Sequence, residues 1–453
     1  MHLFTPEKLK HQLASWPQPG CYWVAFSGGV DSTALLHAMA RIRGELTAEV
    51  KAIHINHGLH PDADSWQDHC GHQCKKLGIP LVCETVQLER VARQSPEALA
   101  RTARYAAIKA KMQNDDMLLT AHHADDQAET LILNLMRGAG VDGLAAIQPV
   151  RRLGRVWLAR PLLEWRRDQL SKFLAGEDIR FIEDPSNEDL SIRRNYVRHE
   201  ILPRLAEMWP AAIDRLNKSA ELARSASSIL KNLAEADLAQ CLGLQVYEIN
   251  LDRFSEFDTN RQALIVREWC RSNKLPTPNQ QQLNELIRQL QDSREDSAVC
   301  LKWPGVELHR YRSMLFIMAA LPDYPQGWQL DWDGLNPADL PGGCGNISLH
   351  CDQLAAFTDP PLRLHVRSGS EQLHPVGQAH HRTLKQLFQS AGIPPWLRSR
   401  IPLVSRNGQC LAVGDIWLDQ QFAELLSESG SSMQWQPGIQ QWRDMRRHIL
   451  AAN

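Results

Sequence analysis

The sequence lacks a long hydrophobic run, paired cysteines and a strong net charge. No stretch of its 453 residues approaches the roughly 18 apolar residues of a membrane-spanning helix. The N-terminus, MHLFTPEKLK, has no apolar core of the secretory kind, so we expect a cytoplasmic protein without a membrane partner. The ten cysteines include no CxxC pair, which is typical of reduced thiols. Because the net charge is only −2, a nucleic acid would have to be bound by local basic patches.

Short apolar runs alternate with helical patterns over the first 140 residues, in a chain long enough for two to four domains. Helices are expected from Val30, from Ser95 and over Ala124–Met136. The alternation predicts an α/β domain with a parallel sheet, whose ligands bind beyond the carboxyl ends of the strands. The runs that we interpret as buried strands are 22–26, 50–55, 80–86 and 117–121.

The patterns change after residue 150. Residues 151–236 read as helical and basic, and two strand-like runs over 298–317 are separated by a Pro-Gly turn. Residues 320–360 are rich in Pro, Gly and Asp and contain no Lys or Arg, which indicates a boundary. Beyond it we expect a helix over 384–391 and a hairpin turning at Asn407-Gly408.

A glycine-rich hexapeptide lies between the first predicted strand and helix, and it reads Ser27-Gly28-Gly29-Val30-Asp31-Ser32. Glycines let the backbone approach an anion closely, and the free N–H groups of a helix N-terminus bind phosphate. The Walker A pattern and its lysine are missing, which suits release of pyrophosphate better than γ-phosphate transfer. Phosphate would repel Asp31 unless Mg²⁺ bridged them, so we expect this carboxylate to bind Mg²⁺. A Gly-Gly turn whose Ser and Asp only cap the helix is the alternative.

Four further stretches narrow the interpretation. They are HINHGL at 54–59, EALARTARY at 97–105, TAHHADDQAET at 120–130, and DPSN with RRNYVR between 184 and 198. Together with the hexapeptide, and in this order, they resemble the tRNA(Ile)-lysidine synthetase family of the N-type (PP-loop) ATP pyrophosphatases. The C-terminal region, with a His-Arg pair at 381–382 and a Gly-Ile-Pro turn at 392–394, is also similar to that family.

The resemblance implies a fold and a domain order. The fold is α/β: a parallel-sheet PP-loop ATP pyrophosphatase domain, followed by a helical linker region and two small α+β C-terminal domains. The expected segments are a catalytic domain at 1–210, linking helices at 211–245, a middle tRNA-binding domain at 246–320, a linker at 321–360 and a C-terminal tRNA-binding domain at 361–435.

The resemblance also implies a ligase reaction. ATP adenylates O2 of the wobble cytidine in the CAU anticodon of minor isoleucine tRNA, pyrophosphate leaves, and free lysine then attacks C2 with release of AMP. The expected cofactors are ATP and Mg²⁺, and the partners are that tRNA and lysine. The sequence is compatible with a homodimer but does not fix the oligomeric state.

The matching positions give candidate residues for each role. Ser27 to Ser32 would bind phosphates, with Asp31 on Mg²⁺. His122 and Asp126 are candidates for positioning the nucleophile or moving its proton, and Arg101 for stabilising charge. Seven basic residues against four acidic ones in 190–224, and seven against one in 361–410, fit an RNA substrate. The candidate tRNA-binding residues are Arg104, Arg194, Asn195, Arg198, Arg382, Lys385, Arg398 and Arg400.

Other functions remain alternatives at this point. The His-His-Ala-Asp-Asp cluster at 122–126 could hold Zn²⁺, since His and Asp at close spacing ligate it. A PP-loop tRNA thiolase is a neighbouring activity, although the missing CxxC pair favours an amine nucleophile over sulfur. A catalytically silent tRNA-binding protein is a third interpretation, against which the intact Asp31 and the cluster at 122–126 argue. The basic residues could also form merely solvated faces.

Overall fold

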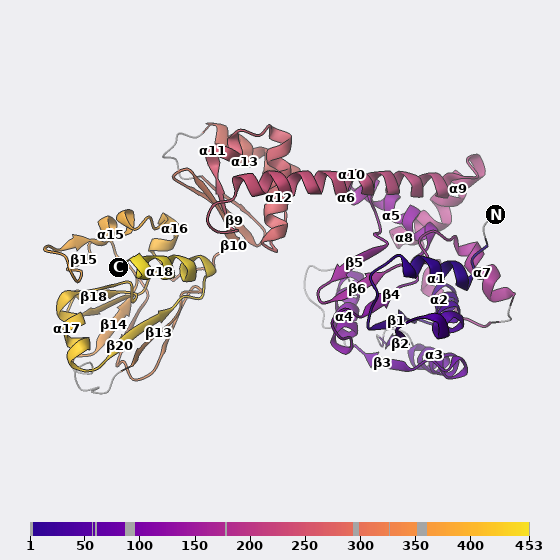
Figure 1. Ribbon diagram of the computed structural model, residues 1–453, viewed down its shortest axis with the longest axis horizontal. Helices are drawn as coiled ribbons and strands as arrows, with labels where there is room; N and C mark the ends of the chain where they lie inside the picture. The colour runs from indigo at the N-terminus through magenta and orange to yellow at the C-terminus, as the bar shows by residue number, and fades with distance from the viewer. Residues whose placement is uncertain are drawn as a thin grey trace. The chain divides into compact units, whose positions relative to one another are not determined.

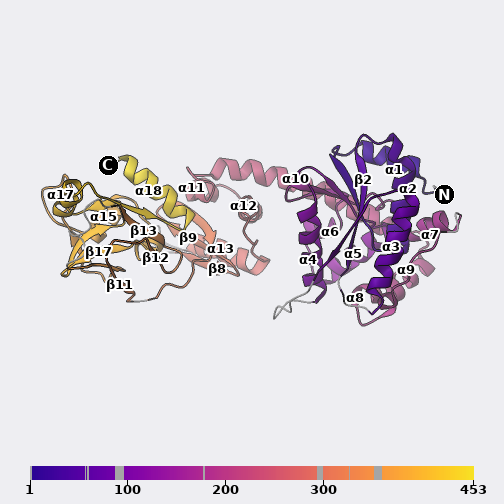
Figure 2. The same ribbon diagram turned by 90° about the horizontal axis from the view of Figure 1, so that it is seen from below.

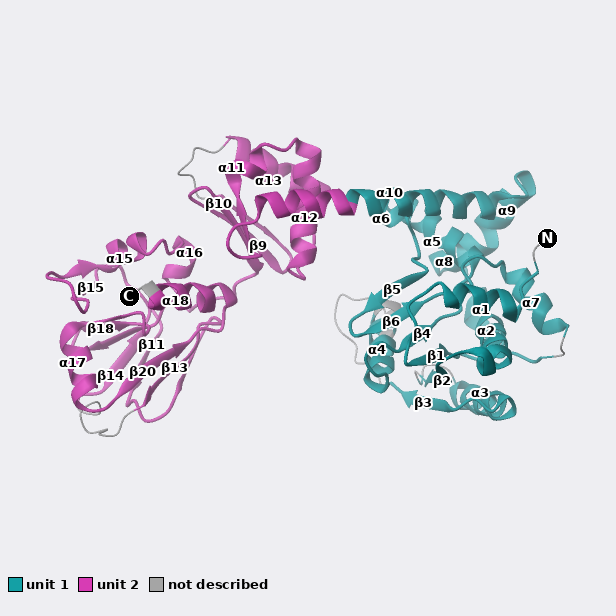
Figure 3. Ribbon diagram, in the orientation of Figure 1, with its two compact units in different colours: residues 1–230 teal, residues 231–453 magenta. Residues whose placement is uncertain are grey.

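The computed structural model describes residues 3–56, 58, 61–86, 96–176, 179–292, 299–325, 327–350 and 360–452. The expected helix start at Ser95, and His57 and Leu59 of the second motif, lie outside these residues. The chain divides into two compact units, residues 1–230 and 231–453 (Figure 3). No helix in the described ranges is long and apolar enough to cross a membrane.

The first unit is built around a six-stranded sheet of order β3-β2-β1-β4-β6-β5 (Figure 1). Neighbouring strands are parallel except β5, which runs antiparallel to β6. The strands are β1 Cys21–Ala25, β2 Glu49–Asn56, β3 Leu81–Thr85, β4 Met117–Leu119, β5 Val150–Leu153 and β6 Val156–Ala159. The four predicted strands and the parallel sheet are therefore confirmed.

Both faces of this sheet are buried, because successive side chains of a strand point to opposite faces. Tyr22 and Val24 pack in one core with α1, α2, α3 and α7. Cys21 and Trp23 pack in a second core with Ile108 of α4. Figure 2 shows the sheet between α4 and the helices α2 and α3. These helices are α1 Pro6–Ala14, α2 Val30–Ile42, α3 Ala63–Leu77, α4 Pro96–Lys111 and α7 Arg167–Ala175.

The expectation that residues 151–236 are helical throughout is wrong at its start. Residues 150–159 form the hairpin β5–β6, in which Val156, Leu158 and Ala159 are fully buried. The basic residues of β5 concealed this strand pattern. The helices that follow are α8 Arg193–Tyr196, a π-helical turn at Val197–Ile201, α9 Leu202–Met208 and α10 Ala212–Cys241; α5 Ala124–Met136, as predicted, and α6 Val141–Leu144 precede the hairpin.

The second unit begins with a four-stranded antiparallel sheet of order β7-β10-β9-β8. Its core packs Trp269 of α12 and Leu283 and Leu286 of α13 against the sheet. The elements are β7 Glu248–Asn250, α11 Leu251–Ser255, α12 Thr259–Ser272, α13 Gln280–Asp292, β8 Cys300–Trp303, β9 Val306–Tyr311 and β10 Met314–Ala319.

The remaining chain forms a five-stranded sheet, β11-β14-β17-β18-β19, a three-stranded sheet, β12-β13-β20, and a small β15-β16 pair. The hairpin at Asn407-Gly408 is confirmed: it joins β17 to β18, and both residues have positive φ, 51° and 80°. The strands are β11 Gln329–Trp332, β12 Ala338–Leu340, β13 Gly345–His350, β14 Leu362–His365, β15 Gln372–Leu373, β16 Arg382–Thr383, β17 Leu403–Arg406, β18 Gln409–Val413, β19 Trp417–Leu418 and β20 Ser432–Gln436. The helices are α15 Leu384–Ser390, α16 Pro395–Arg398, α17 Gln420–Glu428 and α18 Gln440–Ala452.

The prediction that residues 321–360 form a linker is wrong for residues 329–350. β11 pairs with β14, and β13 pairs with β20, so these strands belong to the two sheets. Trp332, Ile347 and Leu349 lie in the same core as Trp435. Short strands separated by Pro, Gly and Asp turns have the composition of a linker, but Trp332, Ala338, Leu340, Ile347 and Leu349 are buried.

Candidate active site

The loops after β1 and β4 meet at the carboxyl edge of the first sheet. β1 lies between β2 and β4, so the chain leaves β1 toward one side of the sheet and later returns on the other. Such a reversal point is where open parallel sheets bind ligands. It brings together the hexapeptide at 27–32 and the cluster at 122–126, as predicted from their positions after strands.

The conformation of the first loop requires glycine at position 28. Gly28 has φ +83°, and a Cβ added there would lie 2.4 Å from Cδ1 of Ile182. The carbonyl oxygen of Gly28 accepts a hydrogen bond from the Ile182 N–H at 2.9 Å. The loop is therefore held from outside by a residue distant in sequence.

Side chains within the loop fix its shape but leave the helix end uncapped. The Ser32 hydroxyl donates to the Gly29 carbonyl oxygen at 3.0 Å and lies 3.0 Å from the Ser27 Oγ. Gly29 is the N-cap of α2, and no side chain caps that helix. The alternative in which Ser and Asp merely cap the helix is therefore wrong. Val30 opens a helix whose first N–H groups are available to an anion.

Asp31 sits in the first turn of α2 with one carboxylate oxygen free. Its Oδ1 is buried and has no hydrogen-bond partner among the described residues, while Oδ2 lies 3.6 Å from Nε2 of His123. A buried, unpartnered carboxylate oxygen beside a phosphate-binding loop is a suitable ligand for Mg²⁺. The residues present therefore fit the metal ion that the loop implies.

His123 is surrounded by carboxylates. It is 1% exposed, and its ring nitrogens lie 3.6 Å from Asp31, 3.4 Å from Asp125 and 3.5 Å from Asp126. Burial alone would lower the pKa of His123, but these carboxylates outweigh it and raise the pKa to about 10. His123 is therefore an imidazolium at neutral pH, and its backbone occupies the N-cap position of α5.

His122 has the opposite character. Burial, together with the nearby cations Arg160, Arg194 and Arg101, lowers its pKa to about 3 against the attraction of Asp126. Its Nδ1 lies 3.0 Å from the Thr120 hydroxyl. His122 is thus neutral at physiological pH and a weak base, which favours positioning over proton transfer.

Two arginines join the segment 193–198 to α5 through a buried ion network. Arg194 donates to Asp126 and Glu129, both at 2.7 Å. Arg198 donates to Glu129 at 2.6 Å and to Asp126 at 3.2 Å. Glu129 is fully buried. Burial opposes ionisation of Asp126, but His123 and Arg194 keep its pKa below the usual range.

Three of the candidate tRNA-binding residues have an internal role, two of them in this network. The charges of Arg194 and Arg198 are compensated by carboxylates of α5. Asn195 is buried and donates from Nδ2 to the carbonyl oxygens of Ser186 and Asp189 at 2.9 and 3.0 Å. Their placement argues for supporting the site rather than for contacting RNA.

The two arginines of α4 lie at the border of the site. Arg101 is exposed, and its guanidinium lies 5.4 Å from the ring centroid of Tyr105. Its influence on the pKa of His122 places it near the cluster at 122–126. Arg104 is also exposed, and it interacts within the chain.

No group of three or more His, Cys, Asp or Glu side chains in the described ranges is arranged to hold a metal ion by itself. The zinc interpretation of the cluster at 122–126 therefore has no support. Cys70 and Cys74, the cysteines of α3, are buried beneath the phosphate loop, and burial raises the pKa of each thiol to about 12. They are inert core residues.

Three family models match the chain: a PP-loop domain over residues 4–205, a TilS substrate binding domain over 249–316 and a TilS substrate C-terminal domain over 362–435. A tRNA(Ile)-lysidine synthase of Xanthomonas campestris pv. campestris (strain 8004) is 36% identical over 417 residues, covering 92% of this chain and 95% of that protein. This chain belongs to the tRNA(Ile)-lysidine synthase family.

Further relatives of the same name are as similar. The Xylella fastidiosa (strain Temecula1) protein is 38% identical over 425 residues, or 93% of this chain and 96% of that protein. The Coxiella burnetii (strain RSA 493) protein is 34% identical over 439 residues, which cover 96% of this chain and 97% of that protein. A solved U34-tRNA thiolase of Methanococcus maripaludis is 18% identical, with a TM-score of 0.41, over 48% of this chain and 78% of its own. That likeness is too weak to bear on function.

The candidate tRNA-binding residues of the C-terminal domain fall into two groups. Arg382 and Lys385, at the start of α15, are exposed. Arg400 is buried and donates to the carbonyl oxygens of Gly342 and Pro322 at 2.7 and 2.8 Å. Arg398 donates to the Ile393 carbonyl oxygen at 2.7 Å. Arg398 and Arg400 therefore stabilise this domain, and only the first pair faces solvent.

Three further residues of the candidate site in this lysidine synthase family member could not be assigned from the sequence. His123 and Glu129 lie inside a motif that we singled out, and their role depends on carboxylates and arginines brought in from other segments. Arg160 follows β6 directly and is 3% exposed. A correct assignment of β6 would have placed Arg160 at the carboxyl edge of the sheet.

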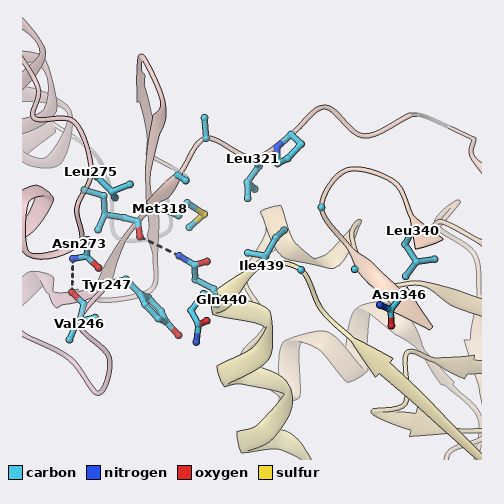
Figure 4. Close-up of a pocket in the computed structure, with 18 of the residues that line it drawn as sticks. Val246, Tyr247, Asn273, Leu275, Met318, Leu321, Leu340, Asn346, Ile439 and Gln440 are labelled. Carbon is cyan, nitrogen blue, oxygen red and sulfur yellow. Dashed lines mark hydrogen bonds between the residues drawn. The ribbon is translucent and has the colours of Figure 1, made fainter. Parts of the chain in front are cut away.

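A separate cavity of about 800 Å³ lies within the second unit, between the β7–β10 sheet and the start of α18 (Figure 4). The Tyr247 hydroxyl near it donates to Asp444 at 3.1 Å, and Gln441 donates to the Ile317 carbonyl oxygen at 3.4 Å. Among the described residues that line the cavity, Asp339 is the single carboxylate, and there is no histidine, lysine or arginine. This lining offers no catalytic group.

Proposed function

We propose that this chain converts the wobble cytidine of the CAU anticodon of minor isoleucine tRNA to lysidine, using ATP and free lysine. One observation carries the proposal: an uncapped phosphate loop, in which the Asp31 Oδ1 has no partner among the described residues, lies beside the cluster at 122–126. Adenylation needs such a loop for the phosphates and a separate site for the second substrate. Membership in the lysidine synthase family supplies the identity of that substrate.

In the first step, O2 of cytidine attacks the α-phosphorus of ATP, a P–O bond forms, and pyrophosphate leaves. The N–H groups at the start of α2 and residues 27–32 would bind the phosphates. Asp31 would hold Mg²⁺, which neutralises phosphate charge when bound. Arg101, exposed beside His122, would stabilise negative charge on the nucleotide.

In the second step, the ε-amine of lysine attacks C2, a C–N bond forms, the C2–O bond breaks and AMP leaves with its oxygen. The ammonium group must lose a proton before it can attack. With an unperturbed pKa of ~10.4, only one molecule in ~10³ carries a neutral amine at pH 7. Ionised Asp126 would hold the ammonium group of lysine by charge. Water would receive the proton, because Asp126 and His122 both have lowered pKa values and are weak bases at pH 7. Neutral His122 would orient the amine.

The tRNA is a large substrate, and we assign its binding to the later domains. Segments 246–320 and 361–435 would contact tRNA, with 211–245 linking them to the catalytic domain at 1–210. Arg382 and Lys385 have exposed cationic groups suited to phosphates. Arg104 is a further candidate near the catalytic site. Cytoplasmic location and a homodimer remain predictions.

The test is incorporation of labelled lysine. Purified protein with ATP and Mg²⁺ should modify minor isoleucine tRNA bearing CAU and release pyrophosphate and AMP. Methionine tRNA bearing the same anticodon should not react, because recognition extends beyond the anticodon. Incorporation of labelled sulfur without lysine would replace the proposal with a thiolase, and tRNA binding without pyrophosphate release would indicate a silent binding protein.

A further inference from the structure

Arg160 is a buried cation at the carboxyl edge of the catalytic sheet. It follows β6, which is parallel to β4, so its loop is next to the loop that carries His122. Only 3% of the residue is exposed. A buried charge costs several kcal/mol unless it is paired and hydrogen-bonded, so its partners indicate its purpose.

The partners that the structure records are all neutral or cationic. One Nη donates to the Gln148 carbonyl oxygen at 2.6 Å, and the Tyr105 hydroxyl is a second hydrogen-bonding neighbour. The Nε is buried and has no partner in the described ranges. No carboxylate in those ranges pairs with Arg160, whereas Arg151 and Arg101 are close enough to disfavour its charge.

The geometry points to Arg160 as an anion-binding residue of the active site, which receives a negatively charged oxygen group of a substrate. A guanidinium presents N–H donors in a rigid fork that matches carboxylate and phosphate oxygens. Arg101 and Arg151 add positive charge around it, and no carboxylate competes within the described residues. This inference rests on the proposed function and deepens it.

Two substrate groups can reach this position. β6 is two strands from β1, so Arg160 lies roughly 10 Å across the sheet from the phosphate loop, given strand spacings of about 4.8 Å. A lysine molecule spans roughly 7 Å from its ε-amine to its carboxyl carbon, since its six bonds are about 1.5 Å each. Its α-carboxylate could therefore reach Arg160 while the amine lies near His122. A phosphodiester beside the target cytidine is the other source.

The experiment compares Arg160→Gln and Arg160→Lys in the full chain, with Arg152→Gln as a matched control. Arg152 lies on the neighbouring strand but points to solvent, where it pairs with Asp115. Lysine, lysinamide and cadaverine are offered as nucleophiles, and tRNA affinity is measured from low to high salt. ATP affinity and the melting temperature report the integrity of the fold.

If the anion is the lysine carboxylate, Arg160→Gln should lower kcat/KM for lysine by about 10- to 100-fold and leave the weak use of cadaverine unchanged. If it is a phosphodiester, the KM for lysine should stay constant while tRNA affinity falls and the slope of log affinity against log salt decreases by about 0.7–0.9. Arg160→Lys should recover part of either loss, because it restores charge without the fork. Either result supports the inference and identifies the ligand.

The inference is overturned if a folded Arg160→Gln protein keeps wild-type dependence on lysine and on tRNA. It is also overturned if both variants melt far below the wild type while their remaining activity has unchanged substrate dependence, since Arg160 is then structural. Failure of the wild type to incorporate lysine would instead refute the proposed function.

Discussion

His122 and His123 are adjacent in the sequence and differ completely in environment. His123 is held among Asp31, Asp125 and Asp126, whereas His122 is buried near the cations Arg160, Arg194 and Arg101, against which Asp126 acts. One is therefore an imidazolium and the other a neutral ring over the whole physiological range. Neither should produce a step in activity near pH 6.5, the usual pKa of histidine.

The charge of His123 should make stability depend on pH. Its pKa in the folded state is about 10, above the ordinary value of 6.5 that applies in the unfolded state. The stabilisation of the folded state by charged His123 is therefore complete below pH 6.5, and it is lost as the pH rises toward 10. Urea unfolding of wild type and His123→Gln should give a difference in free energy that shrinks across this range. A difference that stays constant from pH 6 to pH 10 would contradict the imidazolium assignment.

Asp31 should matter for chemistry but not for RNA binding. Asp31→Asn removes the negative charge while keeping the shape, so Mg²⁺-dependent AMP formation should fall by about 100-fold or more. Affinity for tRNA should stay within about twofold. Asp168→Asn on α7, an exposed carboxylate, is the control. Near-normal turnover of Asp31→Asn would remove this carboxylate from the mechanism.

At the scale of the element, the phosphate loop depends on the approach of Ile182. Gly28→Ala should reduce ATP affinity and cost about 1–3 kcal/mol of stability, because its φ is positive and its Cβ would strike Ile182. Gly44→Ala, which meets nothing within 4 Å, is the matched control. Calorimetric ATP titration and thermal melts measure both effects. Wild-type ATP binding by Gly28→Ala would show that the loop is less constrained than its geometry implies.

The basic segment at 193–198 should behave as an internal brace. Arg194→Ala leaves Asp126 and Glu129 short of a partner, so it should destabilise the chain by about 3 kcal/mol. Arg382→Ala should leave stability unchanged. It should reduce the slope of log tRNA affinity against log salt by about 0.7–0.9, which corresponds to one phosphate contact. Filter binding over a salt series and urea unfolding separate the two. The assignment fails if Arg194→Ala weakens tRNA binding without loss of stability.

Elements with a clear hydrophobic period could be predicted from the sequence, and elements defined by long-range pairing could not. The strands β1 to β4 and the helix α5 have continuous apolar runs or strong start signals. β5 is rich in arginine, and β11 to β13 are short and separated by turn residues, so local composition concealed them. For the same reason Arg400, whose partners are carbonyl oxygens of Gly342 and Pro322, was interpreted as a surface cation.

For the whole molecule, the strand pairing determines where the chain can be cut. Removal of residues from 356 onward leaves β11 and β13 without β14 and β20, which exposes Trp332 and Ile347. We expect that truncation to aggregate. Removal from residue 323 onward deletes the five-stranded and the three-stranded sheet together. The remaining protein should bind ATP, and its tRNA affinity should depend less steeply on salt concentration. Size-exclusion chromatography and binding assays check this, and a monodisperse chain ending at 355 would contradict it.

The pairing of β13 with β20 also sets the order in which the chain can fold during synthesis. The catalytic sheet and its phosphate loop can close once Ile182 has left the ribosome, since that residue holds Gly28. The C-terminal sheets of the second unit must wait for Trp435 and Trp442, both fully buried in their core, which arrive more than 80 residues after β13 begins. Translation that stops in this interval would release a chain with a finished nucleotide site and an open hydrophobic core. Such a chain would be a substrate for chaperones and proteases, although it still binds ATP.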